Sequence, residues 1–111
     1  MHVFIELWNA KPKWLELSSG ERAAYMQNVR EALAAMQEGG IEILGWGSVD
    51  PEISHRAGYD FYAVYRLQNK EQVRAFEEAV EGAGWYDFFE QINTSGELED
   101  AHTVIERLIE V

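Results

Sequence analysis

The first apolar stretch of the chain, "HVFIELW" (residues 2–8), limits the possible folds more than any other feature. Its residues alternate between two sets, which predicts a β-strand. The sets are Val3/Ile5/Leu7 and Phe4/Glu6/Trp8. Both are apolar apart from Glu6. We therefore expect a strand that is covered on both faces and that holds one carboxylate among large side chains.

Two helices are predicted from their caps and their apolar spacing. In "SSGE", Ser18 and Glu21 form a capping box, and the apolar spacing that follows is helical as far as Gly39-Gly40. This stripe consists of Tyr25, Met26, Val29, Leu33 and Met36. Asn69 and Gln72 occupy the capping-box positions of a second helix, which stops before Gly82.

Three further strands and a terminal helix complete the pattern. The strands are expected at Ile41–Trp46, at Tyr59–Leu67 and within Trp85–Leu98, where the first residues are also compatible with a helix. A connection of about a dozen residues, "GSVDPEISHRAG", precedes the strand at Tyr59, and long loops in small domains often carry function. "DAHTVIERLIE" predicts a short C-terminal helix capped by Asp100.

The order βαββαβ predicts one ferredoxin-like domain over residues 1–111. This is an α+β sandwich of four antiparallel strands, with two helices on one face and an added C-terminal helix. Large apolar residues are left for the other face, and we assign to it Phe4, Trp8, Leu44, Trp46, Tyr62 and Val64. A second copy of the chain is the natural cover, so we expect a homodimer.

Composition excludes several classes of function. Twenty acidic and nine basic residues give a net charge of −11, which disfavours binding to nucleic acid or to an anionic membrane. The absence of cysteine excludes disulfides and thiolate chemistry. His2, His55 and His102 lie in separate elements without metal-ligand spacing, so we expect no metal and no other cofactor. With no long apolar run and no signal-peptide pattern at the first residues, we expect a cytoplasmic protein.

Four segments resemble an uncharacterised bacterial family of the dimeric α+β-barrel superfamily. They are "FIELWNAKPKWLEL", "GWG", "HRAGYDFYAVYR" and "GWYDFFEQIN". The superfamily includes antibiotic-biosynthesis monooxygenases, EthD-like and YCII-related proteins and muconolactone isomerase, and the resemblance covers residues 3 to 96 by element order. It implies a homodimer whose facing sheets leave a ligand-sized cavity in each protomer. Some of these monooxygenases activate oxygen without a cofactor by means of asparagine and tryptophan, and Trp8, Asn9 and Trp46 are similar in type.

Glu6 and His55 are the candidates for proton transfer. A carboxylate held against aromatic rings has its charged form disfavoured, which moves its pKa toward neutrality. The alternative for Glu6 is an ion pair with Arg66 or with an arginine of a second copy. His55 has Asp60 as a possible orienting partner and Arg56 as an anion-binding neighbour. The alternative for His55 is a solvent-exposed loop histidine.

These residues lead to two hypotheses of different class. The first is a small cofactor-independent enzyme acting on a compact aromatic or polyketide-like molecule by proton transfer (isomerisation or dehydration) or by oxygenation. Its predicted catalytic residues are Glu6, His55 and Tyr62, and its predicted substrate-binding residues are Trp8, Asn9, Trp46, Arg56, Tyr59 and Asn93. The second is a non-catalytic homodimer that binds a small molecule or another protein, in which the aromatic rings form only core and interface.

Overall fold

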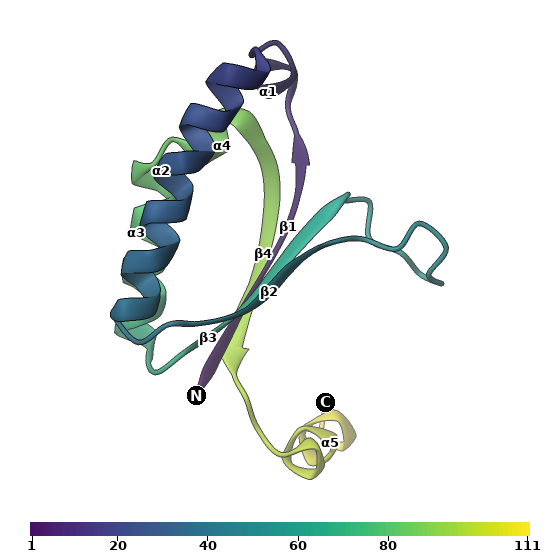
Figure 1. Ribbon diagram of the computed structural model, residues 1–111. Helices are drawn as coiled ribbons and strands as arrows, with labels where there is room; N and C mark the ends of the chain where they lie inside the picture. Colours follow the sequence, from purple (N-terminus) through teal and green to yellow (C-terminus); the bar gives the residue numbers. More distant parts are fainter.

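The computed structural model describes residues 1–111 and has the order β-α-α-β-β-α-α-β-α. Its elements are β1 (His2–Ala10), α1 (Pro12–Leu15), α2 (Ser19–Glu38), β2 (Glu42–Ser48), β3 (Phe61–Leu67), α3 (Lys70–Gly82), α4 (Trp85–Phe88), β4 (Phe89–Glu97) and α5 (Ala101–Ile109). The strands form one antiparallel sheet in the order β2-β3-β1-β4. Helices α2 and α3 cover one face of it (Figure 1). The predicted ferredoxin-like α+β sandwich is confirmed.

The predicted caps hold the helix ends. Ser18 and Glu21 form the complete capping box of α2, in which each side chain bonds the backbone N–H of the other, at 3.1 and 2.9 Å. Asn69 caps α3 by accepting from the N–H of Gln72, and Asp100 caps α5 by accepting from the N–H of His102. These bonds use backbone donors that a helix leaves free at its N-terminus.

The assignment of large residues to the face without helices was partly wrong. In the antiparallel register, Phe4 lies opposite Tyr65 and Trp46 lies opposite Ala63. Paired residues share a face, and Tyr65 and Ala63 are buried under the helices. Phe4, Trp8 and Trp46 therefore face α2 and α3.

The face without helices, called the open face below, carries a smaller apolar set. Ile5 pairs with Val64 and Leu7 with Tyr62 in the register of β1 and β3. Leu7 also lies opposite Ile92 of β4. Tyr62 and Ile92 are 39% and 48% exposed, so this face is apolar but uncovered within the chain.

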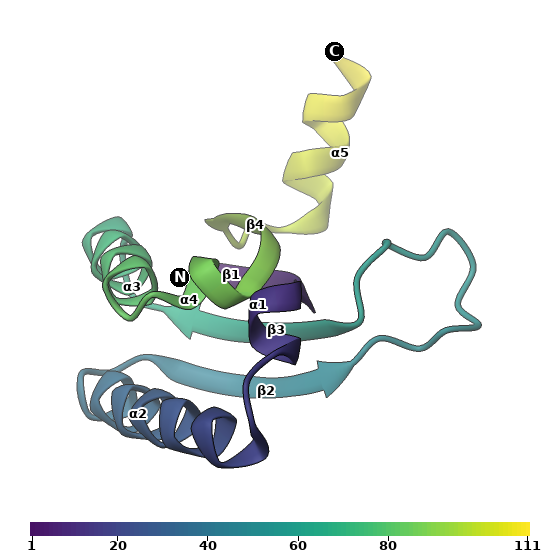
Figure 2. The ribbon, with the colours of Figure 1, turned by 90° about the horizontal axis from the view of Figure 1, so that it is seen from above.

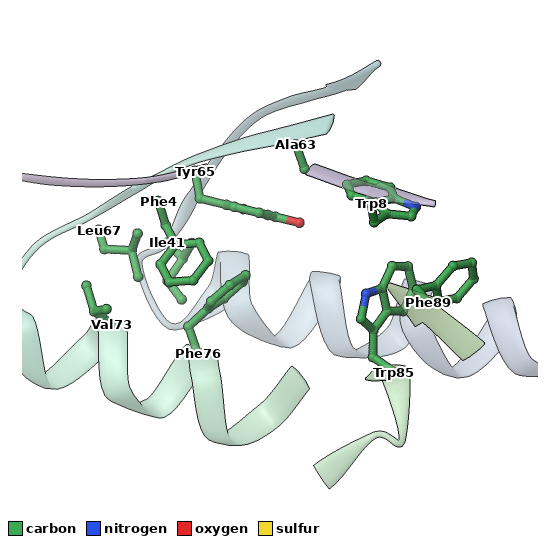
Figure 3. Packing of buried hydrophobic residues seen from close by; sticks show 10 residues of the cluster. All are labelled: Phe4, Trp8, Ile41, Ala63, Tyr65, Leu67, Val73, Phe76, Trp85 and Phe89. Carbon is green, nitrogen blue, oxygen red and sulfur yellow. The ribbon is translucent and has the colours of Figure 1, made fainter. Parts of the chain in front are cut away.

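The core between the sheet and the helices is rich in aromatic rings (Figure 3). Phe4 and Tyr65 from the sheet pack on Phe76 of α3, with ring centroids 4.8 and 4.7 Å apart. Trp85 of α4 stacks on Phe89 at 4.1 Å. Helix α2 has no fully buried residue and contributes a half-buried stripe.

Several boundaries differ from the prediction, and one is β2, which runs from Glu42 to Ser48 rather than from Ile41 to Trp46. Residues 85–88 form the short helix α4 before β4 begins at Phe89, which resolves the ambiguity noted for this segment. Strand β3 begins at Phe61 rather than Tyr59, since the loop before it is tied down by side chains described below. Residues 12–15 form a one-turn helix, α1, with Pro12 at its first position, where proline is well tolerated. No helix is both long and apolar enough to span a lipid bilayer.

Candidate functional site

A cavity of about 50 Å³ lies between the sheet and the helix pair α2/α3, and Glu6 is its one charged residue. The other eleven lining residues are hydrophobic: Val29, Ala32, Leu33, Met36, Trp46, Tyr65, Phe76, Ala79, Val80, Ala83 and Trp85. Because the walls are apolar, any polar group of a bound molecule would have Glu6 and its hydrogen-bond partners as its main polar neighbours.

The alternation of β1 places Glu6 in this cavity. Glu6 lies between Phe4 and Trp8 on the face that packs under the helices, and its side chain is 3% exposed. Its paired residue on β3 is Ala63, whose small side chain leaves room on the helix side of the sheet. Its paired residue on β4 is Asn93. Arg66 is on the opposite face and pairs with Glu42 at 3.0 Å. The predicted alternative, an ion pair between Glu6 and Arg66, is therefore wrong.

Two side chains contact the Glu6 carboxylate. Gln91 Nε2 donates to Glu6 Oε2 at 2.8 Å, and the hydroxyl of Tyr65 lies close enough to act as a donor that lowers the pKa of Glu6. Each of these partners is in turn bound by an indole: Trp46 Nε1 donates to the Tyr65 hydroxyl at 2.9 Å, and Trp85 Nε1 donates to Gln91 Oε1 at 2.7 Å. Figure 3 shows the Tyr65 oxygen pointing toward Trp8 and Trp85.

The two indoles determine the direction of these hydrogen bonds. An indole N–H can only donate, so Gln91 must turn its oxygen to Trp85 and its NH₂ to Glu6. The Tyr65 hydroxyl accepts from Trp46 and keeps its own hydrogen for Glu6. Both chains of donors therefore end on the carboxylate, which acts as an acceptor only.

Burial raises the pKa of Glu6, and the hydrogen bonds from Tyr65 and Gln91 lower it by less. Burial also raises the pKa of the Tyr65 hydroxyl, and the charge of Glu6 raises it further, so the hydroxyl keeps its proton. The result is a carboxylate with a stronger tendency to take up a proton than one in water.

A polar path leads from Glu6 toward the surface along β4. Gln91 Nε2 also donates to Asn93 Oδ1 at 2.8 Å, and Asn93 Nδ2 donates to the hydroxyl of Tyr86 at 3.4 Å. Asn93 is exposed. The predicted residue Asn93 is thus joined to Glu6 through Gln91, without touching the cavity itself.

The predicted aromatic walls divide into one lining residue and one supporting residue. Trp46 lines the cavity. Trp8 is buried behind the lining and packs edge-on against Trp46 at 5.0 Å and Trp85 at 5.6 Å. Trp8 therefore holds the two indoles in position.

Most of the remaining predicted residues lie in or against the loop of residues 49–60 and not around Glu6. The amide of Asn9 ties this loop to β1: its Nδ2 donates to Gly58 O at 3.1 Å, and its Oδ1 accepts from Asp60 N at 2.8 Å. Arg56 donates to Tyr59 O at 3.0 Å and lies 3.6 Å from Asp60, the carboxylate expected to orient His55. His55 is exposed and has a left-handed backbone with φ of 56°.

Tyr62 is placed apart from both groups. Its ring lies on the open face over Gly47, where a Cβ would come within 2.8 Å of the ring. The structure thus brings Glu6, Trp8, Trp46 and Asn93 into one neighbourhood and leaves His55, Arg56, Tyr59 and Tyr62 outside it. Their predicted roles stay predictions. No group of three or more His, Cys, Asp or Glu side chains converges to form a metal site.

Three residues of the site were not predicted: Tyr65, Trp85 and Gln91. A signal for Gln91 was present, since it alternates with Phe89 and Asn93 and is the polar residue nearest in register to Trp8. Tyr65 had the same signal through its spacing from Ala63 and Leu67, both fully buried. Trp85 lies on α4, whose place above the cavity depends on the turn at Gly84.

The fold and site define a small ferredoxin-like α+β protein with one acid in an apolar cavity. The chain belongs to a family of unknown function, DUF6616, whose model matches residues 1–111. No curated protein matches it.

Three solved structures are similar to this chain at low sequence identity. A dimeric ferredoxin-like protein of unknown function from Thermobifida fusca is 14% identical, with 87% of this chain and 90% of that chain covered and a TM-score of 0.53. HapK from Hahella chejuensis is 13% identical, with 91% and 95% covered and a TM-score of 0.49. The 5-chloro-2-hydroxyhydroquinone dehydrochlorinase TftG from Burkholderia phenoliruptrix, in complex with 2,5-dihydroxybenzoquinone, is 14% identical, with 93% and 98% covered and a TM-score of 0.45. At these identities the likeness concerns the fold alone.

Proposed function

We propose that the Glu6 cavity binds a compact, mostly apolar molecule with an acidic O–H or C–H group, and that Glu6 takes the proton of that group. The observation that carries this proposal is a single carboxylate in an apolar cavity whose two partners both donate to it. An ionised carboxylate has about four acceptor positions. Lone pairs are therefore left for a ligand after Tyr65 and Gln91 are counted.

The chemistry that follows is cofactor-independent proton transfer. The bond from hydrogen to a substrate carbon breaks, its electron pair stays on the substrate as an enolate, and the proton binds a Glu6 oxygen. Return of the proton to a different atom completes an isomerisation, and return to a departing hydroxyl completes a dehydration. The raised pKa of Glu6 makes it a stronger base for this step than a solvated glutamate.

The route to the cavity in this proposal lies between α2 and α3. A groove of about 390 Å³ runs between these helices and shares Ala32, Met36, Phe76 and Ala79 with the cavity. Because α2 has no fully buried residue, it is the wall that moves most easily to admit a ligand larger than the cavity. Ala32 and Ala79 are the small side chains on this route, and they leave the most room for a flat ring between Met36 and Phe76.

The step proposed at Glu6 does not use His55 or Tyr62, whose predicted catalytic roles stay predictions. The loop of residues 49–60 contributes no side chain to the cavity, and neither does Tyr62. A role for either residue would require a ligand bound elsewhere, so the variant H55A serves as a discriminating control.

Proton abstraction can be measured without knowledge of the natural substrate. We would follow deuterium uptake in D₂O by NMR at the carbon next to the carbonyl of α-tetralone and related aromatic ketones, with wild type, E6Q, H55A and the exposed-site control E38Q. A positioned general base contributes about 10²–10⁴-fold. We expect E6Q to lose at least 100-fold of the catalysed exchange, and H55A and E38Q to retain it.

The outcomes separate the two classes of protein. Full exchange activity in E6Q would refute the role of Glu6. Binding of these ketones by calorimetry without any catalysed exchange would instead indicate the non-catalytic small-molecule-binding protein.

We further propose that the chain works as a homodimer through its open face. A folded chain of 12.8 kDa exposes about 6,300 Å², whereas this chain exposes 7606 Å². The excess of about 1,300 Å² exceeds the roughly 800 Å² that each partner buries in a standard interface. The similar protein from Thermobifida fusca is dimeric, which supports the same arrangement here.

Light scattering after size-exclusion chromatography tests the dimer directly. We expect twice the 12.8 kDa chain mass at micromolar concentration. V64E, on the open face, should shift the protein to monomer, and R74E, on the exposed side of α3, should not. A monomeric wild type would refute the dimer and leave the proposal for Glu6 standing.

A further inference from the structure

We infer that α5 is an arm that docks on the second copy of the chain. None of its nine residues is buried, and both views show it apart from α2 and α3, beyond the end of β4, which is an edge strand of the sheet (Figures 1 and 2). Its apolar residues are 36–71% exposed: Val104, Ile105, Leu108 and Ile109. Their spacing places them on one helix face. A helix with a fully solvated apolar face lacks its packing partner.

Local interactions alone do not account for this helix. Isolated helices shorter than about 12–15 residues are marginal in water. Asp100 caps α5 at 2.8 Å, and Arg107 donates to both carboxylate oxygens of Glu99 at 2.7 and 3.0 Å. The ion pair is exposed at the surface, where such pairs contribute little, and a single N-cap contributes about 1 kcal/mol. The helix therefore depends on burial of its apolar face against something outside its own domain.

The root of the arm is fixed to the sheet. The N–H of Leu98 donates to Met1 O at 2.9 Å, which extends the pairing of β1 and β4 to the point where the arm leaves. Leu98 and Met1 are 53% and 52% exposed there. The apolar surface thus continues from this edge of the sheet onto α5.

A second copy is the occupant that fits best. The radius of gyration is 16.1 Å, against about 13 Å for a compact domain of this length, so the chain extends beyond its own core. The open face and α5 are both uncovered within the chain, and β4 connects them. A lipid surface fits poorly, because the chain carries a net charge of −11 and the helix bears Glu106 and Glu110. The inference rests on the proposed homodimer and specifies which segment joins it.

The chain has no cysteine, so single labels can be placed cleanly. We would attach a nitroxide to E110C in unlabelled protein, mix it with ¹⁵N-labelled wild type, and measure paramagnetic broadening in the ¹⁵N chain. The matched control is a nitroxide at E78C, on the exposed side of α3. We expect broadening of ¹⁵N amides from E110C and none from E78C.

A second measurement uses the helix faces. I105E and L108E should raise the dimer dissociation constant at least tenfold, as expected for loss of a buried leucine-sized side chain. T103E, on the polar face, should change it less than twofold. These positions are exposed within the protomer, so its own fold does not depend on them.

The outcomes are distinct. If the protein is a dimer but E110C gives no broadening, or I105E and L108E leave the dissociation constant unchanged, the docking of α5 is refuted and the homodimer is retained. A monomer would overturn both. The deuterium-exchange result for Glu6 depends on neither.

Discussion

At the scale of single residues, two indole N–H groups decide how Glu6 behaves. Trp46 and Trp85 can only donate, and their bonds to Tyr65 and Gln91 leave both of those partners facing Glu6 with a hydrogen. Solvent exclusion disfavours the ionised carboxylate, whereas the two donors favour it. The two effects oppose one another, and burial is the larger.

This balance makes stability depend on pH. A carboxyl whose pKa is raised on folding stabilises the native state below its unfolded pKa, and this contribution is lost as the pH rises through the folded pKa. The free energy of unfolding of wild type should therefore fall relative to that of E6Q as the pH rises from 4 toward neutrality. The fall is at most about 1.4 kcal/mol per pH unit. Urea denaturation at several pH values measures it, and a difference independent of pH would contradict the raised pKa.

The Tyr65 hydroxyl is the second residue-scale test. Tyr65→Phe leaves the N–H of Trp46 without its acceptor and Glu6 with one donor fewer, so we expect a loss of about 1–3 kcal/mol of stability. Tyr62→Phe removes a hydroxyl that makes no hydrogen bond within the chain and should be close to neutral. Urea denaturation measures both changes in stability. Equal effects in the two variants would argue against the hydrogen bonds that join Trp46, Tyr65 and Glu6.

At the scale of elements, the contrast between α2 and α3 matters most. Helix α3 buries Val73 and Phe76, whereas α2 covers the sheet with half-buried residues only. The capping box fixes one end of α2. At the other end, Gln72 Nε2 of α3 donates to Gly39 O at 3.0 Å. Between these ends, the Tyr25 hydroxyl donates to Ala83 O at 2.8 Å, and the remaining contacts include Leu33 and Met36, which also line the cavity.

Filling the passage between the two helices tests this view. Ala79 is shared by the cavity and the groove, so Ala79→Leu should weaken binding of α-tetralone at least tenfold. As a surface substitution, it should change stability by less than about 0.5 kcal/mol. Ala34→Leu, on α2 but outside the lining, is the matched control. Calorimetry gives the affinities, and unchanged binding in Ala79→Leu would exclude this route.

At the scale of the whole molecule, net charge and exposed apolar area have opposite effects on dimer formation. Each copy carries a net charge of −11, so association brings like charges together, and salt screens that repulsion. The melting temperature of a dimer rises with protein concentration. We expect the melting temperature to rise with concentration and also with added NaCl, and V64E to lose the dependence on concentration. Scanning calorimetry checks both, and no dependence in wild type would contradict the dimer.

Much of the fold could be predicted because its signals are local. Alternation identified β1 and placed Glu6 with Phe4 and Trp8, and the caps at Ser18, Asn69 and Asp100 follow from side-chain chemistry. Which alternating set faces the helices could not be predicted. Both sets of β1 are apolar, and only the register of β1 against β3 decides between them.

The site was predicted in part for the same reason. Glu6 and Trp46 could be named because each lies within an apolar strand pattern. The partners of Glu6 come from β3, α4 and β4, and their convergence is a property of the tertiary structure. His55 was favoured by its long loop, yet the turn that shapes this loop is held by Asn9 and Arg56 and leaves His55 exposed.

The cluster of Trp8, Trp46 and Trp85 has an optical consequence. Their rings lie 5.0–6.0 Å apart at steep angles, and two of them form walls of the cavity. The fourth tryptophan, Trp14, packs instead against Tyr25 and Phe88. Near-ultraviolet circular dichroism and intrinsic fluorescence should therefore be dominated by the surroundings of Glu6. The protein carries its own unlabelled reporter for any molecule that enters.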